Sequence, residues 1–281
     1  MKLLKETYKG LSEVDTLPKF IKDFLSDPDN QKLLTVSNFV ALYEKADINS
    51  YYLTEVLISS GIDPLDYLDH IPGYFLAHTT IKSINIPKHI KEIRNDAFYV
   101  CTGLTNVTIP DSVTSIGESA FYNCKGLTSI TIPDSVTSIG SSAFDYCTGL
   151  TSVTIGDSVT SISHDAFFGC TGLTSITITD SVTSIGNGAF YGCTGLTSVT
   201  IPDSVTSIGN SAFYGCTGLT SVTIPDSVTS IGSGAFYECS ELNDIKYTGT
   251  KEQWDNIKLG KLWNRKSAIK TIHCIDGDIN L

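Results

Sequence analysis

Apolar and polar residues along most of this chain follow a pattern that returns every 23 residues. One copy, residues 193–215, reads CTGLTSVTIPDSVTSIGNSAFYG. Shifting the sequence by this period superimposes one cysteine and one phenylalanine per copy. The cysteines are Cys101, Cys124, Cys147, Cys170, Cys193, Cys216 and Cys239, and the phenylalanines are Phe98, Phe121, Phe144, Phe167, Phe190, Phe213 and Phe236. A unit this short cannot bury its apolar side chains alone, so the repeat predicts a stack in which each unit covers the next.

The pattern inside one copy predicts a strand, a turn and a compact corner. Residues 196–201 alternate and are rich in β-branched side chains, which favours a strand. The Pro-Asp pair that follows predicts a turn, because proline fixes φ and aspartate accepts local backbone hydrogen bonds. Val205 and Ile208 are expected to point inward, and residues 212–216 to form a short helical or 3₁₀ piece with one buried face. Stacking then aligns the strands into a parallel sheet with rungs about 4.8 Å apart.

The repeated residues L-x-x-V-x-I-P-x-S-V-x-x-I-G-x-x-A-F-x-x-C resemble the BspA-like, or Treponema pallidum-type, family of leucine-rich repeats over roughly residues 79–247. The resemblance implies an α/β repeat solenoid, a right-handed superhelix with a parallel β-sheet on one face and short helical turns on the other. It also implies a binding role, since members of this family are mostly surface adhesins or binding proteins of bacteria and some microbial eukaryotes. The chain departs from the adhesin pattern because no export signal is recognisable.

Changes in the pattern divide the chain into three expected parts. Residues 71–247 hold the tandem repeats, beginning with a degenerate unit in which Phe75 takes the phenylalanine position and His78 the cysteine position. Residues 248–281 are expected to form a C-terminal cap, and they resemble the usual cap of the family. Residues 1–70 lack the repeat and carry apolar residues at helical spacing, which predicts a small all-α N-terminal module. That module either caps the solenoid or acts as an adaptor.

Thr250 and Gln253, in the C-terminal part, have the spacing of a capping box. They predict a short helix that carries Trp254 and Ile257. A terminal unit must present a polar outer face, so this segment is expected to be a cap rather than a ligand site.

The charge balance disfavours several classes of partner. The chain has 30 acidic and 19 basic residues and a net charge of −11, which opposes binding to nucleic acid phosphates. No apolar run approaches the roughly 20 residues of a membrane span, so no membrane insertion is expected. Without a recognisable secretory signal or anchor, the expected location is the cytoplasm or the inside of a particle, with secretion by an unrecognised route left open.

Candidate catalytic chemistry is sparse. The chain has 8 cysteines, but the repeat places seven of them at the same corner of successive coils, where parallel Cβ vectors make disulfide geometry awkward. Reduced, buried thiols are therefore expected. There is no C-x-x-C pair and the histidines are scattered, which predicts no metal site. The G-x-S-A-F segments lack the second glycine of a nucleophile elbow, and no cofactor motif is complete, so we expect a protein that is not an enzyme.

Three columns of side chains are expected at the surface. The outward residues of the sheet are polar and nearly identical from unit to unit: Asn106, Thr108, Ser129, Thr131, Ser152, Thr154, Ser175, Thr177, Ser198, Thr200, Ser221 and Thr223. An aromatic column either shields neighbouring coils or contacts a partner, and comprises Tyr99, Tyr122, Phe168, Tyr191, Tyr214 and Tyr237. An aspartate column either accepts hydrogen bonds from its own turns or gathers cations, and comprises Asp111, Asp134, Asp157, Asp180, Asp203 and Asp226.

A uniform surface carries little information with which to tell one protein from another, so the partner site is expected on the N-terminal module and the first units. The interior departs from uniformity mainly at Asp145, His164 and Asp165. The predicted partner-binding residues are Asn106, Thr108, Ser129, Thr131, Tyr99, Tyr122, Tyr191 and Tyr214.

The leading functional hypothesis is a non-enzymatic binding protein whose solenoid recognises a macromolecular partner, either a protein or a periodic glycan or filament. The first alternative is a structural spacer or assembly component, for instance one encoded by a bacteriophage. The second is an adhesin that binds a host or matrix protein or a glycan.

Overall fold

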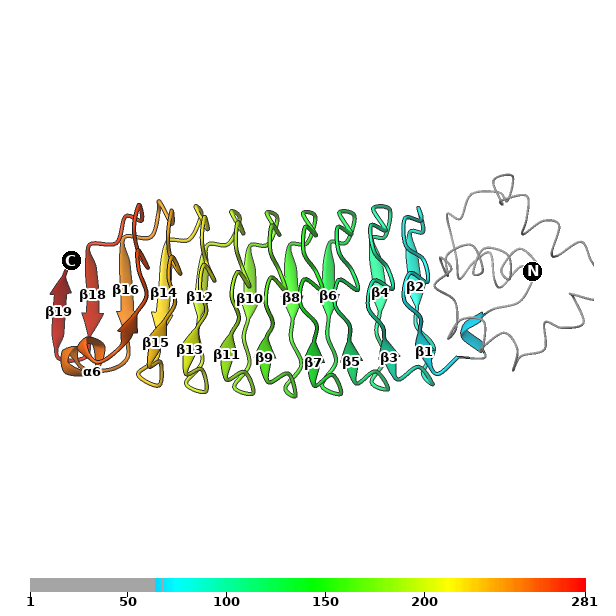
Figure 1. Ribbon diagram of the computed structural model, residues 1–281, viewed down its shortest axis with the longest axis horizontal. Coiled ribbons are helices and arrows are strands. Elements are labelled where there is room, and N and C mark those ends of the chain that lie inside the picture. The colour runs from blue at the N-terminus through cyan, green and yellow to red at the C-terminus, as the bar shows by residue number, and fades with distance from the viewer. Residues whose placement is uncertain (1–63, 67) are drawn as a thin grey trace, which may run out of the picture.

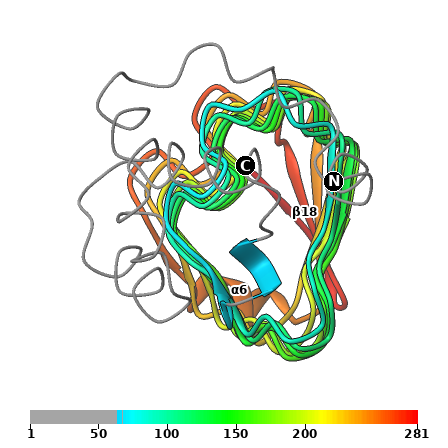
Figure 2. The same cartoon turned by 90° about the vertical axis from the view of Figure 1, so that its right-hand side faces the viewer.

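Residues 64–66 and 68–281 are described by the computed structural model of this chain. They wind into a parallel-strand solenoid of about nine turns (Figure 1). Seen along the rod, successive coils superpose on one another around a single core (Figure 2). Most of the helical module expected over residues 1–70 lies outside the described residues. The described part of that range contains the 3₁₀ helix η1 (Pro64–Asp66) and the first residue of strand β1 (His70–Ile71).

The first strand of each coil forms the predicted parallel sheet. These strands are β2 (Ser83–Asn85), β4 (Asn106–Thr108), β6 (Ser129–Thr131), β8 (Ser152–Thr154), β10 (Ser175–Thr177), β12 (Ser198–Thr200), β14 (Ser221–Ile224), β16 (Asp244–Tyr247) and β18 (Thr271–Cys274). They pair in register within three ladders, β2–β4, β6–β8–β10 and β12–β14–β16–β18. In the middle ladder, Ser129, Ser152 and Ser175 lie side by side. The middle residue of each interior strand is buried between two outward residues, as the alternation predicts. The sheet ends at β19 (Gly277–Asn280), which pairs antiparallel with β18.

A second parallel sheet is present where the sequence predicted only inward-pointing residues. Its strands are β1, β3 (Glu92–Ile93), β5 (Ser115–Ile116), β7 (Ser138–Ile139), β9 (Ser161–Ile162), β11 (Ser184–Ile185), β13 (Ser207–Ile208), β15 (Ser230–Ile231) and β17 (Lys258–Leu259). They pair as two ladders, one from β1 to β7 and one from β9 to β17. Val205 and Ile208 are buried, which confirms their predicted direction. Each of these strands has two residues, too short to show the alternation by which a strand is recognised in a sequence.

The corner that follows the second sheet consists of turns and not of the predicted helical or 3₁₀ piece. Ser211 and Gly215 have φ values of 53° and 68°, in the left-handed region that a right-handed helix excludes. The amide of Phe213 donates to the carbonyl of Ala235 in the next coil at 2.8 Å. Backbone groups that a helix would use internally thus join neighbouring coils. The described region contains one α-helix, α6 (Lys251–Asp255). The solenoid is therefore a β-solenoid with very little helix and not the α/β solenoid that was expected.

Two columns of side chains fill the core at this corner. Phenylalanine rings stack face to face from Phe98 to Phe236, with neighbouring centroids 5.0 to 5.7 Å apart. All seven column cysteines are free and buried, as predicted. From Cys124 onward, each thiol donates to the carbonyl of the phenylalanine in the preceding coil at 3.1 Å. Burial raises the pKa of Cys193 to about 12, so this thiol keeps the proton that it donates.

The first coil is one residue shorter than its sequence match to the next unit implies. Strands β1 and β3 pair at a spacing of 22 residues, whereas β2 and β4 pair at 23. Thr79 and not His78 therefore takes the cysteine position, and its hydroxyl lies 3.6 Å from the thiol of Cys101. The same shift puts Leu76 and not Phe75 in the phenylalanine column, as the backbone bond of Leu76 to the next coil shows.

The C-terminal helix begins with the predicted capping box. The Thr250 hydroxyl accepts from the Gln253 amide at 3.2 Å, and the Gln253 side chain accepts from the Thr250 amide at 2.8 Å. Trp254 and Ile257 are buried. Trp263 meets the last phenylalanine ring edge-on at 6.2 Å and ends that column. These aromatic side chains cover the core at the last coil.

Candidate functional site

The outward face of the first sheet is the polar surface that the sequence predicts. Its serine, threonine and asparagine side chains are exposed along β4 to β12, including Asn106, Thr108, Ser129 and Thr131. Parallel pairing in register sets them in straight columns about 4.8 Å apart. A neighbouring threonine column is already engaged: Thr151, Thr174, Thr197 and Thr220 each donate to the carbonyl of the threonine one coil earlier. From β4 to β12 this face is regular and uncharged, whereas β16 adds the exposed Asp244 and Lys246.

The predicted tyrosine column is half-buried and stacked on itself. The Tyr99 ring lies 4.8 Å from that of Tyr122, and the Tyr191 ring lies 4.5 Å from that of Tyr214, both nearly parallel. Because the ring faces pack on each other, solvent meets the ring edges and hydroxyl groups. The column belongs to the turns and the Ser/Thr columns to the first strands, so the two groups of predicted site residues occupy different segments of each coil. Partner binding by either group stays a prediction.

The aromatic column is interrupted at Asp145, which takes the ring position between Tyr122 and Phe168. Tyr146 turns edge-on into the gap, 6.1 Å from the Tyr122 ring and 5.4 Å from the Phe168 ring. Asp145 is 8% exposed, and its Oδ1 has no hydrogen-bond partner. Burial first, and the charge of Asp165 second, raise the pKa of Asp145 to about 7.

The other two interior exceptions lie beside this buried acid. His164 Nε2 lies 3.0 Å from Asp165 Oδ2, and His164 Nδ1 lies 2.8 Å from the carbonyl oxygen of Asn187. Burial raises the pKa of Asp165, while His164 lowers it. Residues from two successive copies that depart from the repeat thus interact electrostatically, a buried acid in one coil and an imidazole–carboxylate pair in the next.

The aspartate column connects neighbouring coils where its bonds are seen. The Asp134 carboxylate accepts from the amide of Asp157 in the next coil at 3.0 Å, and Asp226 accepts from the Gln253 side chain of the cap at 3.4 Å. The sequence suggested hydrogen bonds within each aspartate's own turn as the alternative to cation binding. Neither of these two bonds is of that kind. In the described coils, no three His, Cys, Asp or Glu side chains are arranged to hold a metal ion.

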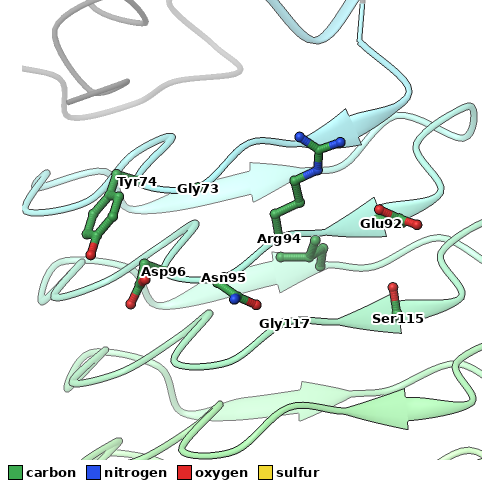
Figure 3. Close-up of a pocket in the computed structure, with 9 residues that line it drawn as sticks. Gly73, Tyr74, Glu92, Arg94, Asn95, Asp96, Ser115 and Gly117 are labelled. Atoms are coloured by element: carbon green, nitrogen blue, oxygen red, sulfur yellow. The ribbon is translucent and has the colours of Figure 1, made fainter. Parts of the chain in front are cut away.

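A shallow hollow of about 450 Å³ lies on the first coils of the second sheet (Figure 3). Its lining comprises Gly73, Tyr74, Glu92, Ile93, Arg94, Asn95, Asp96, Ser115 and Gly117. Figure 3 shows the Arg94 side chain extending toward the preceding coil, with Glu92 and Asp96 to either side of it. The Tyr74 and Asp96 side chains hydrogen-bond to each other, and the charge of Asp96 raises the pKa of the Tyr74 phenol. The hollow therefore combines both signs of charge with amide and phenol groups.

The sheet register shows how far this coil departs from the others. Because β3 pairs with β5, Glu92 takes the position of Ser115 and Arg94 that of Gly117. Further along, the Arg94 position holds Gly140, Ser163, Gly186, Gly209, Gly232 and Gly260. A Cβ on Gly209 would lie 2.5 Å from a backbone carbon of Gly186, so packing against the preceding coil excludes a side chain there. Sequence reasoning missed Glu92 and Arg94, although comparing E-I-R with the S-I-G of later copies marks them.

A second hollow of about 400 Å³ lies over the same columns near the other end of the solenoid. It is lined by Asn187, Ser207, Ile208, Gly209, Asn210, Ser230, Ile231, Gly232, Ser233, Lys258, Leu259 and Gly260. Small polar side chains dominate it, and Lys258 is its one charged residue. The mixed charges of the first hollow are thus a property of the first coils. Across the described coils, no helix has the length and apolar character needed to cross a membrane.

Comparison with known proteins shows which family and which solved structures the repeats resemble. Residues 69–195 and 160–272 match the BspA type leucine rich repeat region, in 6 copies. A solved leucine-rich repeat protein from Bacteroides ovatus is 31% identical with a TM-score of 0.55, over 69% of this chain and 54% of that one. The leucine-rich repeat protein of T. pallidum is 25% identical with a TM-score of 0.50, over 67% of this chain and 81% of that one. A comparison with curated proteins finds no match.

The match to the family extends over most of the chain and follows the coils described above. The chain spans about half the length of the Bacteroides protein. The register of the sheets, the cysteine and phenylalanine columns and the matched residues agree on one conclusion: this chain belongs to the BspA type leucine-rich repeat family.

Proposed function

We propose that this protein is a non-enzymatic binding protein that recognises a protein partner, with the first described coils as the contact that selects the partner. The observation that carries the proposal is the hollow around Arg94. There Glu92, Arg94 and Asp96 stand at positions where the following coil carries serine or glycine. The family supports the general role, since leucine-rich repeat solenoids are generally protein-binding or adhesin-like.

Specificity in a binding surface comes from groups that fit one partner and penalise another. A uniform Ser/Thr face offers the same hydroxyls at every rung, so a protein could dock at several registers with similar energy. Arg94 presents a planar, permanently charged donor group, and Glu92 and Asp96 present acceptors nearby. Arginine and tyrosine are also the residue types that carry much of the energy at protein interfaces, and Tyr74 is 45% exposed.

A protein partner fits this hollow better than a neutral glycan or a repeating filament. An uncharged sugar would leave the charges of Glu92, Arg94 and Asp96 without counterparts, whereas a polypeptide segment carrying both signs would match them. A periodic ligand would be expected to use the uniform interior coils. A structural spacer would need neither surface, and it remains the alternative that the experiment below separates.

The test replaces the first-coil charges with the residues of the next coil, in the triple variant Glu92→Ser, Arg94→Gly, Asp96→Ser. Asp96 has a φ of 58° and Ser119, its equivalent, a φ of 51°, so the serine suits the backbone. The matched control, Asp203→Ser, removes a charge from the exposed aspartate column. Each tagged protein is cross-linked in the source cells, and retained proteins are quantified by mass spectrometry.

We expect a partner that wild type and the Asp203 variant retain and the triple variant loses. Equal retention by all three proteins would place recognition elsewhere on the chain and overturn the site. Retention of nothing but the protein itself would favour the structural spacer. A thermal melt of each variant shows whether the solenoid is still folded.

A further inference from the structure

Exposed apolar side chains gather at the C-terminal end of the solenoid. Among the described residues, the large hydrophobic side chains that are exposed are Tyr74, Tyr146, Leu259, Leu262, Ile275 and Leu281. Four of these six belong to the last coil and the cap, and Leu262 and Ile275 are 52% and 72% exposed. The isoleucines of the interior coils are nearly all buried. Exposed apolar side chains gathered at one end of a protein are a feature of interaction surfaces.

Both sheets also end here, each with an edge that no described strand covers. The second sheet ends at β17 and the first at β19. Leu259 of β17 continues the buried isoleucine column, in register with Ile231, yet it is 41% exposed, since no described strand follows it. The outer edges of β17 and β19 present backbone N–H and C=O groups that can pair with a further strand.

The two edges differ in the charged side chains they carry. Residues 258–270 contain five basic side chains and no acid: Lys258, Lys261, Arg265, Lys266 and Lys270. All five are exposed, and within the described chain Lys266 is the one that forms an ion pair, with Glu238 at 2.9 Å. Asp276 and Asp278 lie at β19, in the turn before it and on the strand itself. Asp276 accepts from the Lys251 amide at 2.9 Å, and Asp278 lies 2.9 Å from His273 Nδ1, so each keeps one carboxylate oxygen for a further partner. The C-terminal end of the rod thus holds a lysine-rich edge at the second sheet and an edge with two aspartates at the first sheet.

We infer that this end is a self-association surface at which two copies meet tail to tail about a two-fold axis. A two-fold interface uses the same surface on both copies, so it needs two mutually complementary patches on one face. Here β19 of one copy lies against β17 and Leu262 of the other, and the reciprocal contact completes the pair. A second copy is the occupant we infer because it brings its own β19 aspartates to the lysines around β17, and the reverse contact repeats the same match.

The first test measures the mass of the full chain in solution by analytical ultracentrifugation across concentration and salt. We expect a monomer–dimer equilibrium that weakens as salt rises, since the edge charges are exposed and therefore screened. Leu262→Asp should weaken dimerisation about tenfold or more by placing a charge in the apolar contact. Leu262 has a φ of 58°, which aspartate tolerates. The matched control is Tyr74→Asp, an exposed apolar side chain on the first coil, which should leave the equilibrium unchanged.

The second test exchanges the charges of the two edges. One variant carries Lys258→Glu and Lys261→Glu, and the other carries Asp276→Lys and Asp278→Lys. Each variant alone opposes like charges at both contacts and should be monomeric. An equal mixture restores opposite charges at both contacts and should dimerise. This recovery on mixing would not follow from a general loss of stability.

Three results would overturn the inference. The first is a full chain that stays monomeric at all concentrations, in which case the edge lysines act to block strand pairing. The second is dimerisation that Leu262→Asp leaves intact, which would place the contact elsewhere. The third is failure of the two folded charge variants to associate when mixed. Circular dichroism melts establish that each variant is folded before its mass is interpreted.

Discussion

At position 145 a carboxyl group stands where the copies on both sides carry an aromatic ring. Tyr146, the next residue in the sequence, fills the ring position instead. Its ring lies edge-on to the rings of Tyr122 and Phe168 in the neighbouring coils. The carboxyl is left buried beneath the column with one oxygen unpartnered and a second acid, Asp165, nearby. A charged carboxylate is unfavourable there, so folding favours the protonated form.

This residue predicts a pH dependence of stability with a definite sign. The unfolded chain loses the Asp145 proton near its usual pKa of 3.8, and the folded chain keeps it until about 7. The free energy of unfolding should therefore fall as pH rises between these values and level off above them. Asp145→Asn should remove this fall, stabilising the protein by about 1–2 kcal/mol above pH 7 and little below pH 4, after allowance for solvent screening.

Urea unfolding of both proteins across this pH range measures the difference. Asp203→Asn provides the control, because Asp203 is exposed and its replacement removes the same charge. Parallel stability–pH curves for wild type and Asp145→Asn would show that the buried acid does not govern this dependence.

At the scale of elements, a column of buried cysteines joins each coil to the next. Cys124 to Cys239 donate their thiols to phenylalanine carbonyls one coil back, and burial raises the pKa of Cys147 and Cys239 to about 12. Cys274 lies outside the column and is partly exposed. Its pKa is also raised, mainly by desolvation, but reagents can reach it.

The columns predict the thiol reactivity of the native protein. One of the eight thiols, that of Cys274, should react readily with a disulfide reagent such as DTNB under native conditions. The other seven should react only when denaturant opens the coils, since all seven are buried and a reagent cannot reach them in the native protein. Cys274→Ser should abolish the native reaction. Rapid reaction of several thiols in the native protein would contradict the buried column.

At the scale of the whole molecule, the sequence period predicts what repeats and misses what does not. The 23-residue shift is enough to place the buried cysteines, the stacked phenylalanines and the exposed face of Asn106 and Thr108, because every copy supplies the same evidence. The second sheet was missed because its strands have two residues each. The turns at residues 212–216 read as helical because apolar spacing does not reveal a positive φ at Gly215.

The candidate site was missed for a related reason. Arg94 has meaning only against the glycine that most other copies carry at the same position, and that comparison needs the copies to be aligned position by position. Hydrophobic periodicity weighs each residue by its polarity, so a charged residue in place of a glycine leaves the predicted core unchanged. The register of β1, β3 and β5 makes the difference visible.

The stacked architecture predicts that a whole copy can be removed. Deleting residues 194–216 joins Cys193 to Thr217 and keeps every column in register, because the segment is one full period. Each unit contacts mainly its neighbours, so the shortened chain should fold and lose roughly the stability of one unit and one interface. Deleting residues 194–204, about half a period, should instead bring polar residues into the cysteine and phenylalanine columns and abolish cooperative folding. Thermal melts followed by circular dichroism separate the two: if the full-period deletion melted without cooperativity, or both deletions melted alike, stability would not reside in the contacts between neighbouring coils.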